Sequence, residues 1–225
     1  MIEINLIHYT KLKERLPFIL DQFKNLEFKI NIIREFDKED ITKQELSKFD
    51  TDYLSKGEIS CFLKHLKVYN DLVDSKCDYA VVIEDDILLN KNFSKKLSKL
   101  TKNLPKNFDF VFFGASKLNM HIPVYKRRPY KNFYKKTNFP TEWGGNGISK
   151  TTDSYVVSRK GAKQIIEWAN NCKQLDDALD FWLNKSARRL DLIGYWYEPT
   201  LTRHNSKFES NLASQYNNVI SKNWC

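Results

Sequence analysis

The chain has 225 residues, of which 41% are hydrophobic and 29% are charged, and its formal net charge is +9. This composition excludes a disordered or fibrous protein, and the length suits one compact domain with a sizeable core. The positive charge favours an anionic partner, such as a phosphorylated ligand, nucleic acid or a membrane surface.

Targeting signals and cysteine spacing bear on the compartment. No apolar run approaches the roughly 20 residues of a membrane helix. The first ten residues, MIEINLIHYT, lack the basic and apolar regions of a signal peptide. The cysteines are far apart in the sequence and form no CxxC pair, so free thiols are expected at Cys61, Cys77, Cys172 and Cys225. Together these features predict a cytoplasmic protein.

Strand patterns alternate with helical patterns along the chain. Apolar, β-rich runs predict strands at residues 2–7, 29–36, 79–84, 108–114, 154–158 and 192–197. Amphipathic patterns predict helices at residues 57–73, 92–105, 158–171 and 175–190. Such alternation is typical of an α/β fold with a mostly parallel sheet, in which ligands bind beyond the carboxyl ends of the strands.

The third predicted strand, YAVVIE, runs into three consecutive carboxylates: Glu84, Asp85 and Asp86. Buried carboxylates are costly unless a cation meets them, so these acids either occupy a solvated turn or hold a divalent cation and its phosphate ligand. Mn²⁺ and Mg²⁺ take carboxylate ligands together with substrate phosphates. On an extended chain Glu84 and Asp86 point the same way, which favours that pair as cation ligands.

A second acidic group, QLDDALD, supplies Asp176, Asp177 and Asp180. If a helix runs through this segment, spacings of three and four residues place Asp180 on one face with the other two. The acids then either stabilise the positive end of the helix dipole or provide a general base.

The segment 115–150 has no clear periodicity and is long for a structureless connection, which is typical of a functional loop. It contains Trp143 and the basic, aromatic stretch 125–136. Such a stretch suits a single-strand binder, but no nucleic-acid-binding motif accompanies it, so we expect no nucleic-acid partner. We favour a loop that contacts a phosphorylated glycolipid at a membrane surface, with Trp143 as a platform for a sugar ring.

Several motifs together resemble glycosyltransferase family 25, the lipooligosaccharide-type and collagen-type galactosyltransferases. The matching pieces, in order, are EINL, LSKGEISCFLKH, YAVVIEDD, TTDSYVVSRKGAKQII and LDDALDFWL. The resemblance covers nearly the whole chain. It implies a GT-A-like nucleotide-sugar-binding fold, a bound Mn²⁺ (or Mg²⁺), and inverting transfer from a UDP-sugar.

The resemblance also implies roles for individual residues. The implied cation ligands are Asp86, Glu84 and His204, although an exposed loop histidine is the alternative for His204. The implied donor-binding residues are Asn5, Arg15, Glu84, Asp85, Asp86 and Thr152. For Arg15 the alternative is an exposed helical arginine, and for Asp85 it is helix capping or solvation. The implied general base is Asp177, then Asp176, and the acceptor-binding candidates are Trp143 and Asp180. For His65 a core histidine is the preferred interpretation.

The expected architecture is a single glycosyltransferase domain, with a donor-binding part at about 1–115 and an acceptor-binding and catalytic part at about 116–225. The expected reaction moves galactose from UDP-galactose to a glycan such as lipooligosaccharide. Alternatives are a UDP-glucose donor, a collagen-like protein acceptor, or a non-catalytic glycan-binding module. The expected location is the cytoplasm, with peripheral association at the inner face of the membrane as a further expectation.

Overall fold

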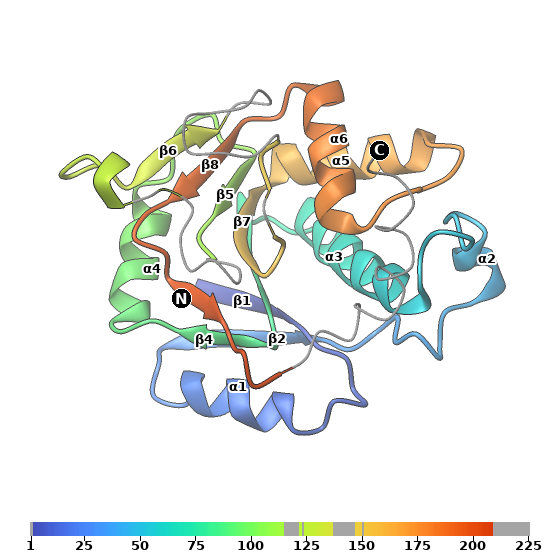
Figure 1. Ribbon diagram of the computed structural model, residues 1–225, viewed down its shortest axis with the longest axis horizontal. Coiled ribbons are helices and arrows are strands. Elements are labelled where there is room, and N and C mark those ends of the chain that lie inside the picture. Colours follow the sequence, from blue (N-terminus) through green and yellow to red (C-terminus); the bar gives the residue numbers. More distant parts are fainter. Residues whose placement is uncertain (1, 115–121, 123, 137–146, 150, 209–225) are drawn as a thin grey trace.

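The computed structural model describes residues 2–114, 122, 124–136, 147–149 and 151–208 (Figure 1). The main sheet contains β1 (Ile2–Ile7), β2 (Phe28–Ile33), β3 (Tyr79–Glu84), β5 (Phe110–Phe112), β6 (Phe133–Lys136), β7 (Ser154–Ser158) and β8 (Gly194–Tyr197). A two-stranded ribbon consists of β4 (Ile87–Leu89) and β9 (Thr202–His204). The helices are α1 (Arg15–Phe23), α2 (Lys43–Leu46), α3 (Lys56–Asp74), α4 (Phe93–Lys102), α5 (Arg159–Asn171) and α6 (Leu179–Leu190), with a 3₁₀ turn at Val124–Lys126.

The seven strands of the main sheet follow the order β2-β1-β3-β7-β5-β8-β6. Strand β1 pairs in parallel with β2 and β3, and β5 pairs in parallel with β8. Because β7 is antiparallel to both β3 and β5, these five strands share one direction, while β7 and β6 run against it. The expected α/β fold with a mostly parallel sheet is confirmed. Strand β7 lies between β3 and β5, so segments from before and after residue 115 build one sheet.

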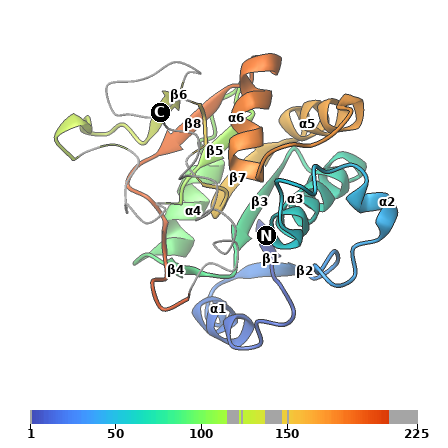
Figure 2. The same cartoon turned by 45° about the vertical axis from the view of Figure 1, so that its right-hand side comes forward.

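Helices cover both faces of the sheet (Figures 1 and 2). On one face, α3, α5 and α6 pack against side chains that include Val82 of β3. On the other face, α1 and α4 pack against Val81 and Ile83 of the same strand. Burial of each such side chain contributes about 1.5–3 kcal/mol. The alternation therefore fixes the register of β3 and the point at which Glu84 leaves the sheet.

Helix α3 begins one residue before the predicted start because of a capping box. The Glu58 amide donates to Ser55 Oγ at 3.2 Å, and the Ser55 amide donates to Glu58 Oε2 at 2.8 Å. These bonds satisfy two donors that the helix start leaves without partners. Glu58 therefore has the capping role that its position at a helix start allows.

The helix predicted at residues 175–190 begins later in the structure, at Leu179. The Leu175 amide donates to Lys48 O at 2.8 Å, and Leu175 O accepts from the Asp50 amide at 2.9 Å. These bonds keep Leu175 extended in a parallel bridge, and α6 starts only at Leu179. Asp176 and Asp177 thus precede the helix, and the expectation that they share a helical face with Asp180 is wrong.

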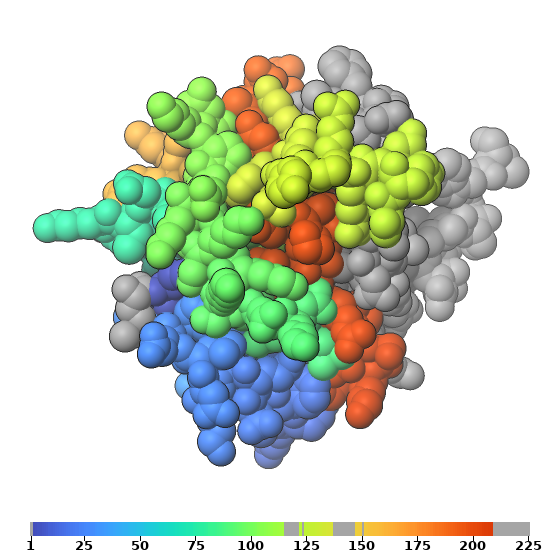
Figure 3. Space-filling model, turned by 90° about the vertical axis from the view of Figure 1, so that its left-hand side faces the viewer, coloured from blue at the N-terminus to red at the C-terminus, as the bar shows by residue number. Residues whose placement is uncertain are grey.

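The segment 115–150 contains more regular structure than its pattern indicates. Residues 133–136 form β6 at the edge of the sheet, paired with β8. Figure 3 shows residues 124–136 in yellow-green above the green helix α4 on one face of the molecule. Trp143 lies outside the described residues. None of the described helices combines the length and apolarity needed to cross a bilayer.

Candidate active site

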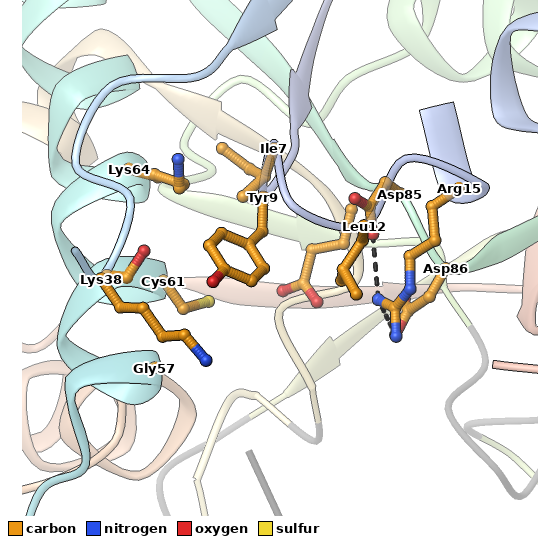
Figure 4. Close-up of a pocket in the computed structure, with 12 residues that line it drawn as sticks. Ile7, Tyr9, Leu12, Arg15, Lys38, Gly57, Cys61, Lys64, Asp85 and Asp86 are labelled. Atoms are coloured by element: carbon orange, nitrogen blue, oxygen red, sulfur yellow. Dashed lines mark hydrogen bonds and ion pairs between the residues drawn. The ribbon is translucent and has the colours of Figure 1, made fainter. Parts of the chain in front are cut away.

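The acidic triplet lies where β3 ends, beside the carboxyl end of β1. Glu84 is in register with Ile7, the last residue of β1, and Asp85 and Asp86 form the turn that leads into β4. A cavity of about 130 Å³ opens at this edge (Figure 4). Its walls come from the β1–α1 segment, α3 and the triplet: Ile7, Tyr9, Leu12, Arg15, Lys38, Gly57, Ser60, Cys61, Lys64, Glu84, Asp85 and Asp86. The cavity therefore lies beyond the carboxyl ends of parallel strands, as the fold class predicts.

Asp85 is a buried anchor for the segment that follows β1. Its Oδ2 lies 2.6 Å from Nδ1 of His8, and its Oδ1 accepts from Arg15 Nη1 at 3.1 Å. Asp85, His8 and Arg15 are all buried. Solvation of Asp85 and exposure of Arg15, the alternatives left open by the sequence, are therefore wrong. Arg15 also reaches Asp86 Oδ2 at 3.5 Å, and both ion pairs are drawn in Figure 4.

Glu84 and Asp86 are held where ionisation is unfavourable. Burial, reinforced by the charges of Asp85 and Asp180, raises the pKa of Glu84 to about 7, although Thr152 Oγ1 donates to Glu84 Oε1 at 3.0 Å. Burial, followed by the charge of Glu84, raises the pKa of Asp86 to about 6. Burial thus penalises the charged form of both carboxyls, and a bound cation would stabilise that form. Their oxygen donors fit Mn²⁺ or Mg²⁺.

The β4–β9 ribbon brings His204 to the triplet from more than one hundred residues away in the sequence. His204 pairs with Ile87, the residue after Asp86, and the next amide, that of Asn205, donates to Asp86 O at 2.9 Å. The charge of His204 acts on Asp86, where it lowers the pKa of that carboxyl against the larger effect of burial. The structure thus groups His204 with Asp86, as the expected cation site requires.

The three late acids divide into two environments. Asp176 and Asp177 both form ion pairs with Lys185, the first at 3.2 Å. Asp180 is half-buried, and its charge contributes to the raised pKa of Glu84. Burial also raises the pKa of Asp180 itself. The charge of Asp180 therefore acts on the triplet.

Thr152 and Asn5, both predicted to bind the sugar donor, have different surroundings. Thr152 is buried against Glu84, so these two residues form one group. Asn5 donates from Nδ2 to Val81 O at 3.2 Å and accepts from Asn31 Nδ2 at 2.9 Å. Its polar atoms thus join β1 to both neighbouring strands, and it is absent from the described cavity wall. These contacts give Asn5 a structural role in the sheet.

Several residues that line the cavity were not predicted from the sequence as site residues. Tyr9 lies two residues after the end of β1, and the rule that sites lie beyond strand ends would have found it. The Lys38 ammonium lies 5.1 Å from the centre of the Tyr9 ring. Lys64 is buried and donates to Asp37 Oδ1 at 2.7 Å and to Glu35 O at 2.6 Å. No local pattern marks Lys64, because it lies within the amphipathic repeat of α3.

Three similarities to known proteins place this site in context. The chain is 24% identical to "Procollagen galactosyltransferase 2" of Homo sapiens over 179 residues, which are 73% of this chain and 27% of that protein. It is 27% identical to "Lipooligosaccharide biosynthesis protein lex-1" of Haemophilus influenzae over 124 residues, which are 52% of this chain and 38% of that protein. The match thus spans about a quarter of the human relative's length and less than half that of lex-1.

The fold is also found among solved structures. An active-site mutant of LgtC superposes with a TM-score of 0.52 at 11% identity, covering 95% of this chain and 92% of the other. This likeness identifies the fold as GT-A. The sequence model described as "Glycosyltransferase family 25 (LPS biosynthesis protein)" matches residues 1–181, which include the whole acidic triplet and Asp180. The chain therefore belongs to glycosyltransferase family 25.

Proposed function

We propose that the protein is a metal-dependent, inverting glycosyltransferase that moves galactose from UDP-galactose to a glycan acceptor. The observation that carries this proposal is the pair Glu84 and Asp86, two carboxyls with raised pKa values at the end of β3 in a cavity. The GT-A fold and the galactosyltransferase among the relatives support the choice of reaction and sugar.

The donor would enter the cavity with its diphosphate near the triplet. Asp86 and Glu84, with His204, would hold Mn²⁺ or Mg²⁺. The bound ion would neutralise the negative charge that develops on the leaving diphosphate. Arg15, held by Asp85, adds a fixed positive charge at the same place. Tyr9 and Leu12 give the cavity an aromatic and aliphatic wall against which a uracil ring can pack.

The acceptor hydroxyl needs a base that takes its proton as it attacks the sugar from the face opposite the diphosphate. Asp177 was the first candidate from sequence, but its ion pair with Lys185 balances its charge. Within the described part of the chain Asp180 forms no ion pair with a cation, its charge acts on Glu84, and burial raises its pKa. A carboxylate with a raised pKa is a stronger base. We therefore favour Asp180 as the base, with Asp177 and Asp176 as its competitors.

The acceptor would be a lipooligosaccharide-type glycan, reached from the cytoplasm at the membrane surface. Tyr125 and Tyr130 are 83% and 105% exposed, next to basic residues of the 125–136 stretch. Exposed aromatic rings beside positive charge suit sugar rings and anionic head groups. The relative named for lipooligosaccharide biosynthesis favours this acceptor, while the procollagen galactosyltransferase keeps a protein acceptor as the second candidate.

Titration calorimetry with UDP tests the proposal directly. We expect UDP to bind in the presence of Mn²⁺ and to bind at least tenfold more weakly without it or to Asp86→Asn. Asp74→Asn, an exposed acid at the end of α3, serves as the control and should bind UDP as the wild type does. Transfer assays with UDP-galactose and UDP-glucose then identify the sugar. Absence of UDP binding with and without Mn²⁺ would overturn the proposal.

A further inference from the structure

A second group of possible metal ligands consists of Glu84 and two side chains of α3. One ligand atom each from Cys61, His65 and Glu84 lies within 4.8 Å of the others. His65 Nε2 is 3.4 Å from Glu84 Oε1. Within the described residues, this is the group of three such side chains that comes this close together, and it includes neither Asp86 nor His204.

His65 is oriented as a metal-binding histidine would be. Its Nδ1 lies 2.6 Å from the Tyr155 hydroxyl, and its ring stacks on the Tyr155 ring with a centroid distance of 5.7 Å. Its Nε2 is fully buried and has no hydrogen-bond partner among the residues that the structure describes. A buried nitrogen without a partner is costly. In metal sites, a hydrogen bond to one ring nitrogen commonly orients the other toward the ion.

The other two ligands leave a path for an ion. Cys61 and His65 are four residues apart on α3, so they lie on the same face one turn apart. Cys61 and Glu84 both line the cavity, and Figure 4 shows the Cys61 sulfur directed into it. An ion can therefore reach the group from the cavity, with His65 behind it as the inner ligand.

We propose that Cys61, His65 and Glu84 form a binding site for a thiophilic divalent cation, with Zn²⁺ as the expected occupant. Thiolate, imidazole and carboxylate together select Zn²⁺ over Mg²⁺ and Mn²⁺, which prefer oxygen ligands. Three protein ligands leave a fourth position open toward the cavity. This site shares Glu84 with the proposed donor site and goes beyond it, because its other two ligands are Cys61 and His65 rather than Asp86 and His204.

The charges of the group balance when the ion binds. A cysteine thiol is ordinarily protonated near pH 7, whereas its thiolate is the form that binds a metal ion. On binding, the S–H bond breaks, its proton leaves to solvent, and a zinc–sulfur bond forms without any change of oxidation state. The thiolate and the Glu84 carboxylate then offset the two positive charges of the ion, which suits a buried position.

Co²⁺ is the probe for this site, because a cobalt–thiolate bond gives a charge-transfer absorption that oxygen and nitrogen ligands do not. The test protein carries Cys77→Ser, Cys172→Ser and Cys225→Ser, so that Cys61 is the remaining thiol. We expect one equivalent of Co²⁺ to produce the absorption and one equivalent of Zn²⁺ to remove it. Adding Cys61→Ser should abolish it, and His65→Gln should weaken Zn²⁺ binding at least tenfold in competition with a chromogenic chelator.

Asp86→Asn separates this site from the donor site. In the same background it should keep the cobalt–thiolate absorption while Mn²⁺-dependent UDP binding is lost. If Cys61→Ser does not fold, the rate at which a thiol reagent modifies Cys61 in the folded three-serine protein replaces it, and Zn²⁺ should slow that rate at least tenfold. Absence of the absorption at saturating Co²⁺ in a folded protein, or modification that Zn²⁺ does not slow, would overturn the proposal.

Discussion

Arg15 Nη1 lies 3.1 Å from Asp85 Oδ1, and both side chains are almost completely buried. The second oxygen of the same carboxylate lies 2.6 Å from His8. Asp85 therefore joins the segment after β1 to the end of β3, while Glu84 and Asp86 on either side of it remain in the cavity wall. Asp85, the middle acid of the triplet, has a structural role. It positions the guanidinium of Arg15, which also reaches Asp86.

Removal of Arg15 should destabilise the protein strongly. Breaking a buried ion pair leaves an uncompensated charge, so Arg15→Met is expected to lower the free energy of unfolding by about 3–5 kcal/mol. Addition of Asp85→Asn to that variant should recover part of the loss, because the unpaired carboxylate is gone. Urea unfolding in metal-free buffer measures both effects.

Lys29→Met is the matched control for this experiment. Lys29 donates to Glu3 at 2.9 Å, but both side chains are exposed, and exposed pairs contribute little. Its midpoint in urea should stay close to that of the wild type. Equal, small effects of Arg15→Met and Lys29→Met would show that the buried pair does not hold the site together.

The position of the acidic triplet at the end of β3 was predictable, because the apolar run that forms the buried strand stops at Ile83 and the three acids follow it. The partners of the acids were not. His8 and Asp85 are separated by 77 positions, and no local pattern specifies a contact over that distance. The prediction of where α6 starts was wrong for the same reason, because backbone hydrogen bonds to residues 48 and 50 keep Leu175 extended. Periodicity reports which face a residue lies on, whereas these contacts depend on the order of strands in the sheet.

His204 illustrates the limit more sharply. Strand β9 has three residues, too few to show an alternating pattern, and it forms only because β4 lies beside it. The resemblance to a family suggested His204 as a ligand, whereas the residues alone favoured an exposed loop. The ribbon places it next to Asp86, where its charge acts on that carboxyl.

Stability of the metal-free protein should fall as the pH rises, relative to Glu84→Gln. Below about pH 4.5 the Glu84 carboxyl is protonated in both the folded and unfolded states. Between its ordinary pKa of 4.5 and the folded value of about 7, the unfolded state loses the proton first. Unfolding then releases a proton, so stability decreases through this window and stays lower above it.

The difference should reach up to about 3 kcal/mol at pH 8, since each unit of pKa corresponds to about 1.4 kcal/mol. Urea unfolding of the wild type and Glu84→Gln at pH 4 and pH 8, with a chelator present, measures it. Saturating Mn²⁺ should reduce the disadvantage of the wild type at pH 8. A difference that does not change between the two pH values would contradict the raised pKa.

Replacement of His204 should weaken cation binding without unfolding the ribbon. His204→Ala removes a candidate ligand beside Asp86, and a lost ligand or its support typically costs 10–100-fold in metal affinity. Mn²⁺ affinity is measured by competition or by calorimetry. Arg203→Ala is the control, because Arg203 is exposed on the same strand and is in backbone register with Leu88. Equal Mn²⁺ affinities in the two variants would exclude His204 as a ligand.

The identity of the general base can be decided by comparing Asp180→Asn with Asp177→Asn. Loss of a general base typically lowers kcat by 10²–10⁴-fold. We expect that loss in Asp180→Asn, with UDP and Mn²⁺ affinity changed by less than about threefold, because Asp180 is not among the proposed cation ligands. Asp177→Asn should leave most of the activity and free Lys185 from one of its two carboxylate partners. Steady-state transfer kinetics with calorimetry for each variant separate the two roles. The reverse order of kcat values would return the base to Asp177, which lies before α6 rather than within its first turn.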